Sequence, residues 1–344
     1  MTRFVDNFST DHLLPPWISK DARSWVFVIN VGKHCLENYI ASHFNCGEPY
    51  CYEACDLPYG VLRITRHDEF SSGHPRNCHE RTLRKIDVNW AYPVRRWQVS
   101  PDNIRYNQQI VWVEPVAFDN NSYTMFSSRE IWGTEADMAL ISVEEDSQPS
   151  RLHVDVAMEG IRKFSPKSKS HMLGIMHVEM GSEDCTDLKT EEAKHPQLKE
   201  FVDLLFKSVR LEGQPLDINR HGELNTLKQF RDVFNMREAV YRALIASNTD
   251  HSDIKNLKFY DGSTVKLDFM WSDTVKEVLI EQFGLECEEP DSHKPRGHPE
   301  GSEKIEEVRV DWNLPRLTKE VALAASFTSD IRYEITGTLH TYGD

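Results

Sequence analysis

Residues 114–133 read Glu-Pro-Val-Ala-Phe-Asp-Asn-Asn-Ser-Tyr-Thr-Met-Phe-Ser-Ser-Arg-Glu-Ile-Trp-Gly, and this stretch decides the fold. Its first part ends an apolar run that starts at Gln109 and is rich in β-branched and aromatic residues, which predicts a strand. Asp119-Asn120 predicts a turn after that strand. Small residues then lead to Arg129-Glu130-Ile-Trp-Gly133, so a strand, a turn and a short approach segment are expected in this order.

This stretch resembles the acetoacetate decarboxylase family. In that family a strand, a Leu-Asp-Asn turn and a Gly-Arg-Glu element lead directly to Pro-Lys-Lys, and the match here runs without a gap. It is most specific at Asp119-Asn120 and Arg129-Glu130. The resemblance implies an α+β fold of mainly antiparallel strands, a large barrel or cone with helices packed outside and an interior cavity for a small keto compound.

Other strands and helices are expected on both sides of this stretch. Strands are predicted at 23–31, 59–65, 151–158, 172–180, 304–310 and 331–341. Helices are predicted at 33–44, 196–210, 227–247 and 272–283, with Ser272 as an N-cap and Gly284 just past the end of the last one. Strands at both ends enclose the helices, so residues 1–344 are interpreted as one enlarged domain. That domain carries a helical insertion near 190–285 and a flexible loop at 288–303.

The resemblance also identifies the position of the reactive amine. In the family, the first lysine of Pro-Lys-Lys forms a Schiff base with the substrate, whereas this chain has Thr134, Glu135 and Ala136. We therefore expect acid–base chemistry, with Glu135 as the catalytic carboxylate and Asp137 two residues further on. The alternative is that Glu135 is a polar residue on the rim of a cavity.

Glu114 is the third candidate for catalysis, because it is an acid within an otherwise apolar strand. If it faces the interior it is a buried acid. Pro115, however, indicates an edge or a bulge, where the carboxylate would be solvated.

Four residues are candidates for substrate binding. Arg23 matches a family position that lines the pocket, and a guanidinium group suits a substrate carboxylate. Tyr123, Met125 and Trp132 are side chains that an apolar ligand cavity would use, and a core would use them equally well.

Composition excludes several classes of protein. The chain has 344 residues, with 55 acidic and 40 basic side chains and a net charge of −15, which argues against a nucleic-acid binder. No apolar run is long enough for a membrane span, and the N-terminus lacks the pattern of a signal peptide. The seven cysteines form no paired framework, so reduced thiols in the cytoplasm are expected.

Metal and cofactor binding are not expected at the candidate site. An N-terminal cluster could supply zinc ligands, although its spacing fits no common zinc module; it comprises Cys46, Cys51, Cys55, His74, Cys78 and His79. His153 and Asp155 share one face of a predicted strand, and the simplest interpretation is a solvated outer face.

The leading hypothesis is a lyase-like enzyme for a keto or polyketide-like substrate, in a homo-oligomer and in secondary metabolism. It would act by dehydration, cyclisation, retro-aldol cleavage or a related step. One alternative is a non-catalytic protein that keeps the cavity and binds a small molecule. A second is a decarboxylase with a relocated lysine, for which Lys163, Lys167 and Lys169 are the nearest candidates.

Overall fold

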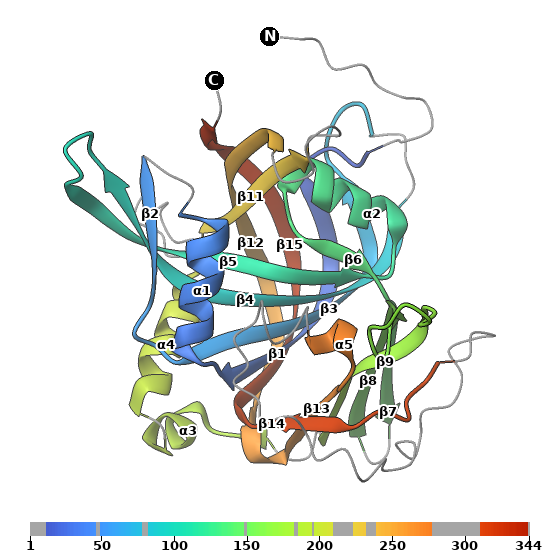
Figure 1. Cartoon of the computed structure of the whole chain (residues 1–344). Coiled ribbons are helices and arrows are strands. Elements are labelled where there is room, and N and C mark those ends of the chain that lie inside the picture. The colour runs from blue at the N-terminus through green and yellow to red at the C-terminus, as the bar shows by residue number, and fades with distance from the viewer. Residues whose placement is uncertain are drawn as a thin grey trace.

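A computed structural model describes most of the chain (Figure 1). The described residues are 12–45, 49–77, 82–147, 150–181, 185–194, 196–208, 223–231, 239–276 and 310–342. Strands form most of this part of the molecule and assemble into two sheets.

The larger sheet follows the order β2-β4-β3-β1-β15-β12-β11-β5-β6, and β4 also pairs with β5, which closes seven of the strands into a ring. All neighbours are antiparallel except β11–β5 and β5–β6. A two-residue strand, β10 (Cys185–Thr186), pairs with β12. The other members are β1 (Trp17–Asn30), β2 (Tyr50–Ala54), β3 (Tyr59–Ser72), β4 (Leu83–Val99), β5 (Arg105–Asp119), β6 (Ala136–Met138), β11 (Glu223–Arg231), β12 (Ala239–Asp261) and β15 (Val321–Tyr342).

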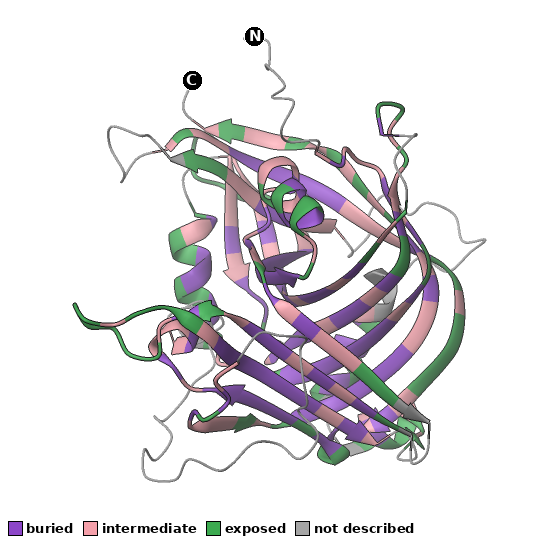
Figure 2. Cartoon of the chain, turned by 90° about the vertical axis from the view of Figure 1, so that its right-hand side faces the viewer, coloured by how far each residue is buried: buried purple, intermediate pink, exposed green. Residues whose placement is uncertain are grey.

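The smaller sheet packs against one face of the larger one. Its order is β14-β13-β9-β8-β7, with bounds Arg316–Lys319, Val265–Met270, His171–Gly181, Ser150–Gly160 and Leu140–Ser147. Alternate residues of β8, such as Val154 and Val156, join Trp25 and Phe27 of β1 in one hydrophobic core. Figure 2 shows long buried stretches along the strands of both sheets.

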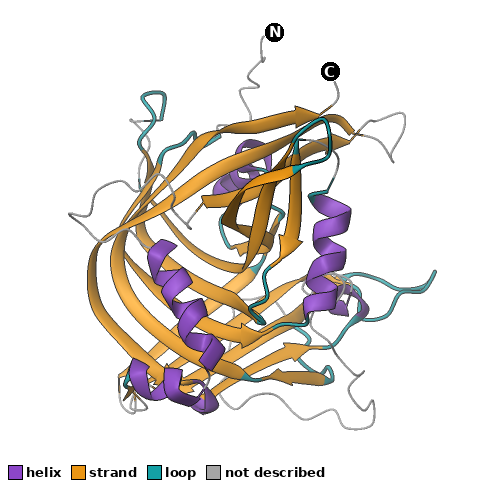
Figure 3. Ribbon diagram, turned by 90° about the vertical axis from the view of Figure 1, so that its left-hand side faces the viewer, coloured by secondary structure: helices purple, strands orange, loops and turns teal. Residues whose placement is uncertain are grey.

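The opposite face of the larger sheet is the inner face of the ring, and helix α4 (Pro196–Ser208) packs there. This helix therefore does not pack outside the ring, as was expected for the helices. Phe201 and Val202 of α4 form one buried cluster with Val28 and Trp112, which alternate along their strands with residues of the main core. Both faces of β1 are therefore buried, which explains its continuous apolar run. Figure 3 shows the two longest helices, α1 (Lys33–His43) and α4, with strands behind them. The remaining short helices are α2 (Ser122–Ser127), a π-helical turn (Ser128–Trp132), α3 (Leu188–Lys194), a 3-10 turn (Gly262–Thr264) and α5 (Asp273–Val275).

The predicted helix at 227–247 is wrong. Its described residues, 227–231 and 239–247, belong to β11 and β12, which pair antiparallel with Leu227 opposite Leu244. The apolar spacing of this segment fits a helix locally. In the fold, however, β12 also pairs with β15 along most of its length. Pairing with a strand that is distant in sequence overrides the local spacing of apolar residues. The expected insertion at 190–285 is likewise only partly helical, because β11, β12 and β13 lie within it.

Most other predicted elements are confirmed, including α1, α4 and the strands before residue 181. The hydroxyl of Ser272 accepts a hydrogen bond from the Val275 amide at 3.1 Å, as expected for an N-cap. Gly284, the loop at 288–303 and residues 304–309 lie outside the described residues. Among the helices that the structure describes, none is long and apolar enough to cross a membrane.

Candidate functional site

The ring of strands encloses a cavity with two lobes. The first lobe has a volume of about 120 Å³ and the second about 60 Å³. Strands β3, β4, β5, β11 and β12 contribute to both lobes, through Arg63, Asn89, Glu114, Leu224 and Thr249. The walls of the first lobe are otherwise mainly apolar, formed by Val26, Val61, Ala91, Trp112, Leu205, Leu257, Ala325 and Phe327.

Glu114 lies where the two lobes meet. The register between β4 and β5 shifts here, so that Glu114 and Pro115 together lie opposite Ala91 in a β-bulge. The side chain is buried, and both of its oxygens accept hydrogen bonds from Asn89 Nδ2, each at 3.2 Å. Burial raises the pKa of Glu114 to about 7, although the positive charge of Arg63 opposes this shift. The carboxyl group therefore changes its protonation state near neutral pH.

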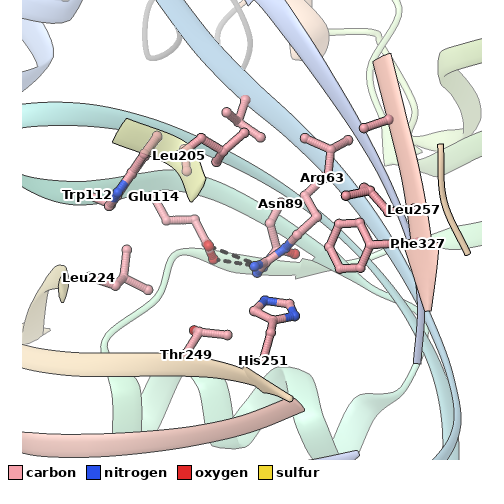
Figure 4. A pocket seen from close by; sticks show the side chains of 14 residues that line it. Arg63, Asn89, Trp112, Glu114, Leu205, Leu224, Thr249, His251, Leu257 and Phe327 are labelled. Carbon is pink, nitrogen blue, oxygen red and sulfur yellow. Dashed lines mark hydrogen bonds between the residues drawn. The ribbon is translucent and has the colours of Figure 1, made fainter. Parts of the chain in front are cut away.

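Arg63, Asn89 and His251 converge on the same space as the Glu114 carboxyl (Figure 4). Arg63 of β3 and Asn89 of β4 are directly opposite each other in the sheet. Arg63 Nε and Asn89 Oδ1 are buried polar atoms that lack a hydrogen-bond partner. Since buried polar groups are normally paired, these atoms indicate a place where a polar ligand would bind.

His251 is a neutral base in the wall of the first lobe. Its Nδ1 lies 2.9 Å from Ser329 Oγ, and its ring meets Phe327 edge to face at 5.6 Å. Burial, followed by the positive charge of Arg63, lowers the pKa of His251 to about 3. The imidazole therefore adds no charge to the cavity at neutral pH.

The second lobe contains a buried lysine held by two acids. Lys85 Nζ lies 2.7 Å from Asp87 Oδ2 and 3.4 Å from Asp119 Oδ2. Burial alone would lower the pKa of Lys85, but the two carboxylates outweigh it and raise the pKa. Lys85 is therefore a charged ammonium group and not a free amine nucleophile.

The Asp119-Asn120 turn positions this lysine. Asp119 accepts hydrogen bonds from the Asn121 amide at 2.8 Å and from the Thr124 hydroxyl at 2.5 Å. The side chain of Asn120 accepts one from the Ile86 amide of β4 at 2.7 Å. The turn predicted from sequence thus joins the ends of β4 and β5 and places a carboxylate beside the ammonium group.

Two of the site residues predicted from sequence line the cavity. Glu114 is in both lobes, and Trp132 is in the second, where its buried indole nitrogen has no hydrogen-bond partner. Met125 is buried against Ala117 and Ala136 beside the second lobe. Tyr123 is 56% exposed.

The other predicted residues lie away from the described cavity lining. Glu135 is partly exposed, 3.9 Å from His43 Nε2, and burial raises its pKa. Its neighbours Thr134 and Ala136 line the second lobe instead. Asp137 pairs with Arg129 at 3.3 Å, and burial raises its pKa also.

Arg23 contacts the smaller sheet and not the cavity, through an ion pair with Glu145 at 2.6 Å. The three candidate lysines Lys163, Lys167 and Lys169 are all exposed. In the N-terminal Cys/His group, Cys51 and Cys55 are free thiols, whereas Cys46, Cys78 and His79 lie outside the described residues.

Sequence reasoning missed Arg63, Asn89, His251 and Lys85. Arg63 has the same sequence signal as Glu114, because it is a charged residue inside an apolar strand. Side chains alternate along a strand, so Arg63 lies on the same face of β3 as Val61. The other three give no such signal, because they reach the cavity only through strand pairing.

The structure is similar to solved acetoacetate decarboxylases. The enzyme from Legionella pneumophila matches with a TM-score of 0.54 and 10% identity, over 99% of this chain and 92% of that one. A second acetoacetate decarboxylase matches at 0.50 and 13% identity, over 95% and 91%. The enduracididine biosynthesis enzyme MppR, with HEPES buffer bound, matches at 0.50 and 10%, over 96% and 88%. No protein-family model and no curated protein sequence matches the chain.

These matches confirm the acetoacetate decarboxylase-like fold expected from residues 114–133. The similarity covers nearly the whole chain.

Proposed function

We propose that the protein is a small-molecule enzyme that acts on a keto compound carrying a carboxylate, by acid–base chemistry at Glu114. The observation that carries this proposal is a buried carboxyl group with a pKa of about 7, between the two lobes of the cavity. A general acid or base is most effective when its pKa is near the working pH. We also propose that the chain forms one enlarged domain, since the fold match spans nearly all of it.

Each polar residue around Glu114 has a role in this proposal. Arg63 binds the substrate carboxylate, because a guanidinium group offers paired donors to two oxygens. Asn89 holds the Glu114 carboxyl in position through its amide. Glu114 in its ionised form then takes a proton from the carbon next to the keto group, and the resulting enolate continues to an elimination or carbon–carbon bond cleavage.

Schiff-base chemistry is not part of the proposal. Lys85 is the amine that lines the described cavity, and Asp87 and Asp119 keep it protonated. Treatment with borohydride in the presence of acetoacetate tests this point. Labelling of any lysine would favour the decarboxylase alternative, and the absence of labelling agrees with acid–base chemistry.

The proposed proton transfer is measured by hydrogen–deuterium exchange. The protein is mixed in D₂O with pyruvate and with a panel of other 2-oxo and 3-oxo acids, and loss of the signals next to the keto group is followed by proton NMR. We expect the wild-type protein to accelerate exchange of at least one acid, and Glu114→Gln to slow it by about 100-fold or more. Glu135→Gln is the matched control, since Glu135 is outside the described cavity lining.

Equal exchange by the wild type and Glu114→Gln would refute the role of Glu114. Saturable binding of these acids without any exchange would instead support the non-catalytic binding protein. We also propose a role in secondary metabolism, because the biosynthetic enzyme MppR has a similar fold. The substrate that the panel of acids identifies tests this role.

A further inference from the structure

The smaller sheet carries two histidines and a glutamate close together on its face away from the main core. His153 of β8 lies directly opposite Glu179 of β9, and His177 is two residues before Glu179. Their ligand atoms all lie within 4.8 Å of one another. The intervening residues Val154 and Val178 point into the main core, which places the three polar side chains on the other face.

Asp155 orients one of these histidines. His177 is buried, and its Nδ1 lies 2.7 Å from Asp155 Oδ1, so that the ring donates its Nδ1 proton to the carboxylate. In neutral imidazole this leaves Nε2 with a free lone pair. A carboxylate on one ring nitrogen is the arrangement that fixes metal-binding histidines in proteins.

We propose that His153, His177 and Glu179 bind one zinc ion, with water in the remaining position. Two imidazoles and a carboxylate are a common ligand set of zinc sites that keep one position open. The negative charges of Glu179 and Asp155 balance the two positive charges of the ion. This site is separate from the cavity around Glu114 and does not depend on the function proposed for it.

Ion binding requires only small side-chain movements. In a tetrahedral zinc site, neighbouring ligand atoms lie about 3.4 Å apart. In this structure the ligand atoms of His153, His177 and Glu179 lie within 4.8 Å of one another, so they must move closer by little more than about 1 Å. His153 and Glu179 are only partly buried, and zinc binding requires their side chains to turn towards the buried His177. Arg151 lies 3.8 Å from Glu179, but this ion pair is largely exposed and therefore weak, so zinc displaces it.

Calorimetric titration of the full-length protein with zinc chloride, after treatment with a chelator, tests the site. We expect one zinc ion per chain, and affinity at least tenfold lower in His153→Gln and in Glu179→Gln. Asp155→Asn is expected to weaken binding by about 10–100-fold, because it removes the partner of His177. The control is His171→Gln, an exposed histidine on the same strand, which should bind zinc as the wild type does.

Cobalt replacement distinguishes this site from the cysteines of the chain. Nitrogen and oxygen ligands give a visible cobalt spectrum without a thiolate charge-transfer band. The proposal is overturned if the wild type binds no zinc, if the three variants bind it as tightly as the wild type, or if the thiolate band appears. His177 is left unchanged in these tests because it is buried and its loss could affect folding.

Discussion

Replacing Glu114 by glutamine should stabilise the protein at alkaline pH. Burial raises the pKa of this carboxyl group from 4.5 to about 7, so the folded state holds the proton more tightly than the unfolded state does. Below pH 4.5 both states are protonated and the group carries no penalty. As pH rises from 4.5 to 7 the unfolded state ionises first, and folding becomes less favourable.

The size of this penalty follows from the pKa difference. A shift of about 2.5 units corresponds to about 3 kcal/mol of unfolding free energy, fully expressed above pH 7. Glutamine has nearly the same shape and does not ionise, so it removes the penalty. Its amide oxygen can still accept a hydrogen bond from Asn89.

Thermal unfolding of the wild type and Glu114→Gln at pH 5 and pH 8 measures the effect. The melting temperature of the variant should exceed that of the wild type by several degrees more at pH 8 than at pH 5. Glu37→Gln, at an exposed position on α1, is the control and should show no such difference. A melting-temperature difference that is equal at the two pH values would show that Glu114 ionises normally, and the catalytic assignment would lose its basis.

Three further predictions concern the same cavity and its wall. Lys85→Met should lower the unfolding free energy at pH 7 by about 3–5 kcal/mol in chemical denaturation, because Asp87 and Asp119 would lose their buried cation. Gly133→Ala should cost about 1–2 kcal/mol or more in the same assay. Gly133 has a φ of 72°, and an added Cβ would lie 2.7 Å from the backbone of Lys228. Affinity for an oxo acid that the exchange panel identifies, measured by calorimetry, should fall as pH rises above about 7, by up to tenfold per pH unit, because ionised Glu114 repels the substrate carboxylate. Constant affinity between pH 6 and 9 would contradict this.

The fold was predictable because its deciding segment is local. Residues 114–133 contain a strand, a turn and the side chains that stabilise the turn, all within reach of one another. The error at 227–247 has the opposite cause, since β12 is held by β11 and by the distant β15. A pattern of apolar residues at helical spacing cannot reveal such partners.

The candidate site was only partly predictable for the same reason. Glu114 was identified because a charge in an apolar strand is visible in the sequence itself. The contact between Lys85 and Asp119 joins residues 34 positions apart, and only the pairing of β4 with β5 brings them together. Glu135 was chosen through its place in the motif, but its neighbours Thr134 and Ala136 are the residues that line the second lobe.

The charges around the cavity connect substrate binding to the protonation of Glu114. Arg63 and Lys85 supply two positive charges, and Asp87 and Asp119 supply two negative ones, so the cavity is neutral when Glu114 is protonated. When Glu114 is ionised and a substrate carboxylate is bound, the cavity therefore holds two more negative charges than positive ones. The bound anion must raise the pKa of Glu114 further, since like charges disfavour ionisation. If Glu114 is the base, the pKa seen in the pH dependence of kcat must therefore lie above the pKa seen in kcat/KM, which belongs to the free enzyme.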